Sequence, residues 1–199
     1  MFYETAANRH GLRHDPFKAL VAPRPIGWIS SLNRQGQVNL APYSYFNAVS
    51  NDPHVVVFGS QGRKDSQRNI EETGEFVCNL ATWGLREAMN QTSAMVASEV
   101  DEMALAGLEP APSRMVGPPR VAASPVALEC RYMQTVHLPV KPGFGENSVI
   151  FGEVVGIHIA DEAIEDGMID ITRLRTIARC GYHDYAVVDS VFAMIRPTV

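Results

Sequence analysis

Residues 24–47 read RPIGWISSLNRQGQVNLAPYSYFN. Strand-like runs at Ile26–Leu32 and Val38–Leu40 flank the turn Asn33–Gly36, a pattern typical of an antiparallel hairpin. The second run then passes into a corner of small and aromatic residues, Ala41–Asn47. Such a corner lets backbone N–H groups and a hydroxyl approach a flat heterocycle. This stretch predicts a β-rich fold with a bent strand at the edge of a ligand site.

The rest of the chain alternates further strand-like runs with turns and short helical patterns. Further strands are expected at Phe46–Val49, His54–Gly59, Glu75–Leu80, Val126–Val136, Ser148–Ile159 and Tyr185–Ile195, and helices at Ser66–Thr73, Gly84–Thr92, Asp101–Ala106 and Asp170–Ile177. Asp65 is expected to be the N-cap of the first helix, and Gly74 its C-terminal stop. We expect Pro110–Pro125 to form a long ordered loop, because each proline lacks a backbone donor. The pattern predicts a mostly β fold, an antiparallel Greek-key barrel, rather than a βαβ fold.

A chain of 199 residues is expected to form one domain, spanning 1–199. Residues 1–23 are interpreted as a leader, and we expect residues 1–14 to pack on the barrel. The start lacks the basic and apolar regions of a signal peptide, and no apolar run is long enough to span a bilayer. The cytoplasm is therefore the expected compartment.

Charge and cysteine content narrow the function classes. The net charge of −5 disfavours a general nucleic-acid or anionic-membrane binder, although a local basic cluster could bind a small phosphate. Cys78, Cys130 and Cys180 lie far apart and are expected to be inert buried thiols. The six histidines lack the clustered spacing of a metal site, so no metal is expected.

Basic and hydroxyl residues gather before the first predicted helix. Ser60, Arg63, Lys64 and Ser66 converge on the helix start at Asp65, where free N–H groups and partial positive charge suit a phosphate. From the residues alone, a capped surface helix with ordinary basic side chains is the favoured interpretation. Neither GxGxxG nor GxxxxGK[ST] occurs, so any phosphate must be held by barrel loops and this helix end.

Six motifs in order resemble the flavin reductase-like family over roughly residues 15–197. They are Trp28–Ser31 (WISS), Asn39–Asn47 (NLAPYSYFN), Lys64–Ile70 (KDSQRNI), Thr73–Asn79 (TGEFVCN), Phe151–Val155 (FGEVV) and Arg179–Tyr185 (RCGYHDY). The resemblance implies an FMN-binding split β-barrel, with the Lys64–Ile70 motif on the FMN phosphate and Ala41–Asn47 beside the isoalloxazine, Ser44 near its reactive edge.

The resemblance also implies a set of cofactor-binding residues. They are Trp28, Ser30, Ser31, Asn39, Ala41, Pro42, Tyr43, Ser44, Tyr45, Phe46, Asn47, Ser60, Arg63, Lys64, Asp65, Ser66, Asn147 and His183. Many relatives carry a histidine where this chain has Asn147, so a catalytic imidazole is not carried over there. Tyr43, Tyr45 and Phe46 could equally be core aromatics, and His183 a structural residue. No catalytic acid or base is assigned, because the flavin carries the redox chemistry itself.

The activity that the resemblance implies is NAD(P)H:flavin oxidoreduction, with NADH or NADPH as substrate. Electrons would pass from FMN to a second flavin, a partner monooxygenase or an electron-transfer protein. The alternatives are a flavoredoxin-like FMN electron carrier without a nicotinamide site, and a non-catalytic split-barrel module that binds haem or another ligand.

A homodimer with flavin sites at or near its interface is also expected. The Pro110–Pro125 and Leu138–Phe144 loops are too apolar for plain solvated connectors, and we expect them to meet the partner or wall the cleft. Their apolar residues are Met115, Val116, Val121, Leu138, Val140 and Phe144.

Overall fold

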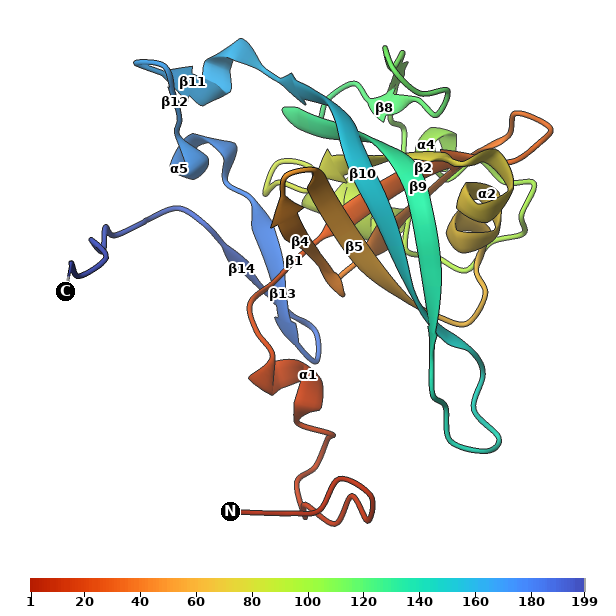
Figure 1. The fold of residues 1–199 in the computed structure, drawn as a ribbon, viewed down its shortest axis with the longest axis vertical. Helices are drawn as coiled ribbons and strands as arrows, with labels where there is room; N and C mark the ends of the chain where they lie inside the picture. Colours follow the sequence, from red (N-terminus) through yellow and green to blue (C-terminus); the bar gives the residue numbers. More distant parts are fainter. Residues whose placement is uncertain (199) are drawn as a thin grey trace.

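The computed structural model describes residues 1–198, and its centre is a seven-stranded antiparallel sheet (Figure 1). The strands lie in the order β3-β2-β6-β9-β10-β5-β4. Their bounds are β2 Gly27–Leu32, β3 Val38–Tyr43, β4 Phe46–Asn51, β5 His54–Gln61, β6 Glu75–Leu80, β9 Val126–Leu138 and β10 Asn147–Ile159. The expected mostly β, antiparallel architecture is confirmed.

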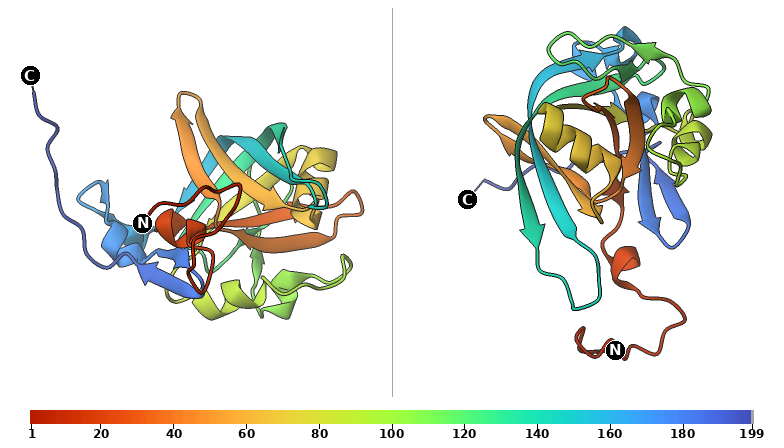
Figure 2. Two further views of the ribbon diagram at one scale, coloured as in Figure 1. Left: turned by 90° about the horizontal axis from the view of Figure 1, so that it is seen from below. Right: turned by 90° about the vertical axis from the view of Figure 1, so that its right-hand side faces the viewer.

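The two edge strands of this sheet are consecutive in the chain. β3 ends at Tyr43 and β4 begins at Phe46, so only Ser44 and Tyr45 connect them. The sheet therefore curls until its edges approach one another, and the corner marks the split in the barrel (Figure 2). The prediction of a bent strand at Ala41–Asn47 is confirmed, although β3 runs three residues further than expected.

A second sheet lies beside the barrel and was not predicted in this form. It has the order β1-β13-β14, with bounds Arg24–Pro25, Ile177–Gly181 and Asp184–Val187. The expected strand at Tyr185–Ile195 is wrong beyond Val187, because residues 188–198 take no regular structure. The expected helix at Asp170–Ile177 is a single turn, α5 Ile171–Leu174, capped by the Asp170 side chain.

The remaining helices are short. They are α1 Phe17–Leu20, which was not predicted, α2 Asp65–Thr73, α3 Arg86–Gln91, α4 Glu102–Leu105 and the 3-10 turn η1 Asp161–Ala163. Asp65 is not the N-cap of α2 as expected: it is the first helical residue, and Lys64 occupies the cap position without a capping side chain. Gly74 ends α2 with φ of 78°, and its N–H donates to the Ile70 carbonyl, which confirms the predicted stop.

Two-residue strands form two further ribbons. β7 Pro110–Ala111 pairs with β8 Arg120–Val121 inside the region expected to be a loop, and β11 Ile164–Glu165 pairs with β12 Met168–Ile169. Val116 and Val121 from the first region were expected to meet a partner or to wall the cofactor cleft. Both are buried in their own chain, which contradicts the first of these two alternatives. They fill the core of their own chain because the ribbon folds back over β6.

The core divides between the two faces of the curled sheet. Trp28 and Leu40 pack with Met89, Met103 and Ile177 on one side. On the other, Phe58 and Phe76 lie edge-on with ring centroids 5.9 Å apart, inside the barrel with Ile29 and Ile150. A side chain at Gly152 would lie 2.2 Å from the Phe76 ring, so only glycine fits beside it.

The termini lie outside the barrel. Residues 1–15 extend beyond α1, and the His14 ring lies 5.5 Å from that of Tyr182 in the β13–β14 turn (Figure 1). Cys78 and Cys130 are buried as expected, but Cys180 is half-exposed because it lies on the narrow second sheet. No helix within residues 1–198 is long and apolar enough to cross a membrane.

Candidate functional site

A cavity of about 380 Å³ opens between the start of α2 and the end of β3. Eight of the residues predicted to hold a cofactor line it together: Asn39, Ala41, Pro42, Tyr43, Arg63, Lys64, Asp65 and Ser66. α2 packs on β2 and β3, which brings two motifs separated by about twenty residues of sequence to one place. The structure thus assembles the predicted phosphate end into one cavity.

Buried hydroxyl groups form the base of this cavity. Tyr43 and Ser66 are both buried, and Asn39 Nδ2 donates to Ser66 Oγ over 2.8 Å. Tyr43 OH has no hydrogen-bond partner among the described residues. Burial raises the Tyr43 pKa to about 12, and the nearby Ser66 and Ser60 hydroxyls offset only part of that shift without reaching hydrogen-bond geometry. A buried donor without a partner costs free energy, so this cavity favours an acceptor.

The start of α2 is open toward the same cavity. Within residues 1–198 no side chain caps it, and the first-turn N–H groups of an α-helix have no partner inside the helix. Asp65 instead pairs with Arg68 at 2.5 Å and accepts from Ser98 Oγ at 3.2 Å. Lys64 is exposed, with Nζ 5.8 Å from the centre of the Tyr43 ring. The first turn, Lys64 and Tyr43 thus direct hydrogen-bond donors and one positive charge toward the same cavity.

Arg63 differs from the expectation for a phosphate ligand. It lines the cavity, but its Nη2 lies 2.8 Å from Glu71 Oε2 on α2. That carboxylate already neutralises the guanidinium. Lys64, which has no ion pair within the described chain, carries the unneutralised positive charge at the start of α2.

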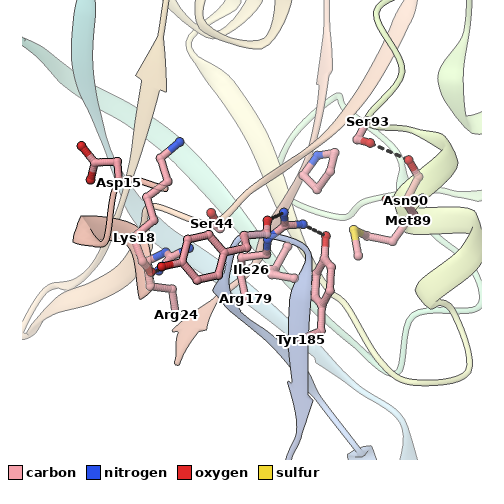
Figure 3. A pocket seen from close by; sticks show the side chains of 12 residues that line it. Asp15, Lys18, Arg24, Ile26, Ser44, Met89, Asn90, Ser93, Arg179 and Tyr185 are labelled. Carbon is pink, nitrogen blue, oxygen red and sulfur yellow. Dashed lines mark hydrogen bonds between the residues drawn. The ribbon is translucent and has the colours of Figure 1, made fainter. Parts of the chain in front are cut away.

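A second cavity of about 320 Å³ adjoins the first, with Pro42 and Ser93 lining both (Figure 3). Ser44 lies in this second cavity, at the corner between β3 and β4. Its other walls come from α1, α3 and the second sheet. They include Lys18, Arg24, Asn90, Arg179 and Tyr185. The groove therefore continues from the α2 start past the Ser44 corner.

A third cavity of about 370 Å³ adjoins the second. Met89, Asn90, Arg179 and Tyr185 line both. His183, an exposed residue of the β13–β14 turn, belongs to this third cavity together with Trp83 and Arg86. The structure thus places His183 in the same groove system, at the end far from Lys64.

Four predicted residues lie behind the groove. Trp28, Ser30, Ser31 and Ser60 are all buried. Trp28 Nε1 donates to Thr92 Oγ1 over 2.9 Å, Ser30 Oγ donates to the Pro119 carbonyl over 2.6 Å, and Ser60 Oγ donates to the Gly62 carbonyl over 2.8 Å. These hydrogen bonds tie β2 to Thr92 and to Pro119, and the end of β5 to the turn at Gly62.

Four others lie away from the groove lining. Phe46 packs over Gly27, where an added Cβ would lie 2.5 Å from the ring, and Tyr45 packs over Gly59. The Asn47 side chain accepts from the Ala48 N–H on the exposed face of β4. Asn147 begins β10 opposite Gln61, outside all three cavities. Within one chain, the structure does not bring these four to the ligand groove.

Sequence reasoning missed other lining residues of both cavities. Thr92, Ser93, Met95 and Glu102 also line the first cavity, and burial raises the Glu102 pKa while its Oε2 accepts the Leu40 N–H. Lys18, Arg24 and Arg179 also line the second. Arg179 could have been found, because it opens the RCGYHDY motif; the others carry no local signal. Within residues 1–198 there is no group of three or more His, Cys, Asp and Glu residues arranged to hold a metal ion.

Known proteins resemble this chain over nearly all of its length. An uncharacterized protein from Halalkalibacterium halodurans is 34% identical, over 90% of this chain and 88% of its own. The crystal structure of nitrilotriacetate monooxygenase component B from Bacillus cereus superposes with a TM-score of 0.88 at 30% identity, covering 98% of both chains. That of 2-nitrobenzoate 2-nitroreductase from Pseudomonas fluorescens gives 0.86 at 26% identity, covering 100% of this chain and 97% of its own.

A putative flavin reductase with a split barrel domain from Shewanella frigidimarina shares the fold, with a TM-score of 0.83 at 23% identity over 98% of this chain and 94% of its own. The barrel split at the Ser44 corner is thus the fold expected from the motifs. The family model described as "Flavin reductase like domain" matches residues 20–178, which include the α2 start and the Ser44 corner. The chain therefore belongs to the flavin reductase-like family.

Proposed function

We propose that this protein is an FMN-binding oxidoreductase that transfers hydride from NADH or NADPH to FMN. The observation that carries the proposal is the continuous groove, which begins at the uncapped start of α2 and passes the Ser44 corner. Its first end suits a phosphate, and its middle is bordered by small residues of β3. A flavin mononucleotide combines a phosphate with a flat ring in the same order.

The residues at the α2 end fit a phosphate. The first-turn N–H groups and the Tyr43 hydroxyl are donors without partners among the described residues, and Lys64 adds a positive charge. Hydrogen bonds to charged groups are roughly twice as strong as neutral ones. Lys64, Ser66 and Tyr43 are therefore proposed to hold the FMN phosphate, whereas Arg63 has a minor part because Glu71 neutralises it.

The residues at the corner fit the edge of a ring. Ala41 and Pro42 present little side chain, so the backbone of β3 can approach a planar ligand, and Ser44 adds a hydroxyl. When bound, FMN supplies the capacity to accept and donate a hydride. The protein's part is to orient the ring and to exclude water from the Pro42 side.

The relatives bear on the electron acceptor. One similar structure is component B of a monooxygenase and another is a nitroreductase. We therefore include a partner monooxygenase, a second flavin or a small oxidant as acceptor of the electrons.

Oxidation of NADH by the purified protein with added FMN, followed at 340 nm, tests the reductase activity. Absence of turnover with both NADH and NADPH, in a protein that binds FMN, would indicate an electron carrier without a nicotinamide site.

A homodimer is part of the same proposal. The β9–β10 hairpin projects from the barrel (Figure 1). Its Leu138, Val140 and Phe144 side chains are exposed, the last of these by 72%, and Met115 is also exposed. Exposed apolar side chains on a projecting hairpin are usually covered by a partner. Asn147 lies at the base of this hairpin, and in a two-fold pair we expect it to approach the groove of the other chain. Light scattering at micromolar concentration tests this, since a monomer with full FMN affinity and activity contradicts it.

A further inference from the structure

The second sheet places two arginines directly opposite one another. Arg24 on β1 and Arg179 on β13 are paired residues of the antiparallel ladder, and Tyr185 on β14 is the next residue in the same row. Directly opposite residues point to the same face of a sheet, and like charges there destabilise the pair. All three side chains line the second cavity, beside Ser44 (Figure 3).

Neither arginine is neutralised by a carboxylate within residues 1–198. Arg24 is only 6% exposed, its Nη1 donates to the Lys18 and Val21 carbonyls, and its Nε has no partner among the described atoms. Arg179 is held in place by the Tyr185 hydroxyl and the Tyr182 carbonyl. A buried guanidinium without a counter-charge is costly, which favours an anion in the cavity.

The charge of the whole cavity points the same way. Lys18, Arg24 and Arg179 give three positive charges, and Asp15 is the one carboxylate among the lining residues. Asp15 Oδ1 already accepts the Phe17 N–H over 2.9 Å, and its Oδ2 accepts from Asn8 over 3.3 Å. This excess of two positive charges is opposite in sign to the net charge of the whole protein, which is −5.

The position of the cluster separates it from the phosphate end. Lys64 and Ser66 line the first cavity and not the second, while Arg24 and Arg179 line the second and not the first. Pro42 lines both cavities, and Ser44 lines the second. We propose that Arg24 and Arg179 form an anion subsite for the carboxylate or phosphate group of the substrate that exchanges electrons with the flavin. The inference rests on the proposed function and names the class of its second substrate: planar molecules that carry an anionic group.

The test compares benzoate with benzamide, which have the same ring and differ in charge, by calorimetric titration of the FMN-loaded protein. Wild-type protein is expected to bind benzoate at least tenfold more tightly, the scale of a charge-assisted bond. Arg179→Gln is expected to abolish that preference and leave benzamide within about twofold, because an uncharged ligand does not use the guanidinium. Arg179→Lys, which keeps the charge but loses the planar fork, is expected to keep part of the preference.

Arg34→Gln is the matched control. It removes the same charge from the β2–β3 turn, where the Arg34 side chain is 70% exposed, and should leave both affinities unchanged. A repeat of the benzoate titration in the presence of NAD⁺ distinguishes two sources of the anion. Competition by NAD⁺ identifies the dinucleotide diphosphate, and benzoate binding that is unaffected by bound NAD⁺ identifies a carboxylate on the electron acceptor. Both outcomes support the subsite.

Equal affinities for benzoate and benzamide in the wild type would overturn the inference. So would an Arg179→Gln protein that loses FMN affinity but keeps riboflavin affinity, because the FMN phosphate would then occupy the arginine cluster. These outcomes are distinct from failure of the proposed function, in which the wild-type protein binds no FMN at all.

Discussion

The two ends of the groove are built in different ways. The α2 end combines the continuous segment Arg63–Ser66 with β3 residues between Asn39 and Tyr43. The arginine end combines α1 and β1 with β13, and its residues Arg24 and Arg179 lie 155 positions apart in the chain. The first end is formed by two segments that are close in the sequence, around a helix start; the second exists only when the two termini of the domain pair. A short sequence motif can therefore indicate one end of a groove while the other end, built from distant segments, has no such motif.

The largest expected effect is the loss of FMN affinity when Lys64, at the α2 end, is replaced. Lys64→Ala removes the unneutralised charge at the α2 start and should weaken FMN binding by roughly 1.5–3 kcal/mol, the range for a hydrogen bond to a charged group. Riboflavin, which lacks the phosphate, should lose almost nothing. Fluorescence titration with both ligands measures the two losses, and equal losses would show that Lys64 acts through folding.

The contact between α1 and β13 at the arginine end can be disrupted by a larger side chain at Gly181. A Cβ at Gly181 would lie 2.6 Å from Ala19 Cα, so Gly181→Ala must push α1 away from β13. Overpacking of this kind costs about 1–3 kcal/mol of unfolding free energy. Urea unfolding measures the loss, with Gly145→Ala as the control, because no atom lies within 4 Å of a Cβ built there. An unchanged midpoint for Gly181→Ala would contradict the close packing.

The buried hydroxyl at the α2 end gives a smaller effect. Tyr43→Phe removes a donor without a partner in the described chain, so we expect the unfolding free energy of the apoprotein to stay the same or rise. FMN affinity should fall by about 0.5–1.5 kcal/mol if the hydroxyl donates to the phosphate. Parallel urea and FMN titrations measure both quantities, and the combination of lower stability with unchanged affinity would show a structural hydroxyl.

The same residue predicts a dependence on alkaline pH. Burial raises the Tyr43 pKa from 10.0 to about 12, so the folded protein keeps a proton that the unfolded chain releases. The unfolding free energy should therefore be unaffected below pH 10 and should decline as the pH rises from about 10 toward 12. Unfolding of wild type and Tyr43→Phe over this range measures the difference, which disappears if the hydroxyl ionises normally.

The smallest effect is expected at Arg63. Glu71 lies 2.8 Å from its guanidinium, and 51% of the Arg63 side chain is exposed. Exposed ion pairs contribute about 0–1 kcal/mol, so Arg63→Ala should change FMN affinity far less than Lys64→Ala. If the two variants weaken FMN equally, Arg63 leaves Glu71 to contact the phosphate.

The sequence by itself determined the antiparallel barrel and the strand corner at Ala41–Asn47, and it indicated the start of α2 as a candidate phosphate site. Alternation and turn residues specify strands locally, and Gly74 stops α2 through its own backbone freedom. It also determined the family, through six motifs in order.

Only the tertiary structure decided which motif residues face the groove. Trp28, Ser30 and Ser31 match the family motif, yet all three are buried behind the groove. They belong to β2, which lies between β3 and β6 and has packed core on both faces, and the sequence does not state that a strand will take such an interior position. Likewise, the charge partner of Arg63 is Glu71, the residue directly after the Lys64–Ile70 motif.

The pairing of Arg24 with Arg179 also came from the tertiary structure alone. The register between β1 and β13 depends on the whole barrel that lies between them in the chain, and on the contact of Gly181 with Ala19 that brings α1 to the second sheet. No local pattern encodes such a meeting of distant residues, because strand pairing across a long stretch of chain is fixed by the packing of the intervening core.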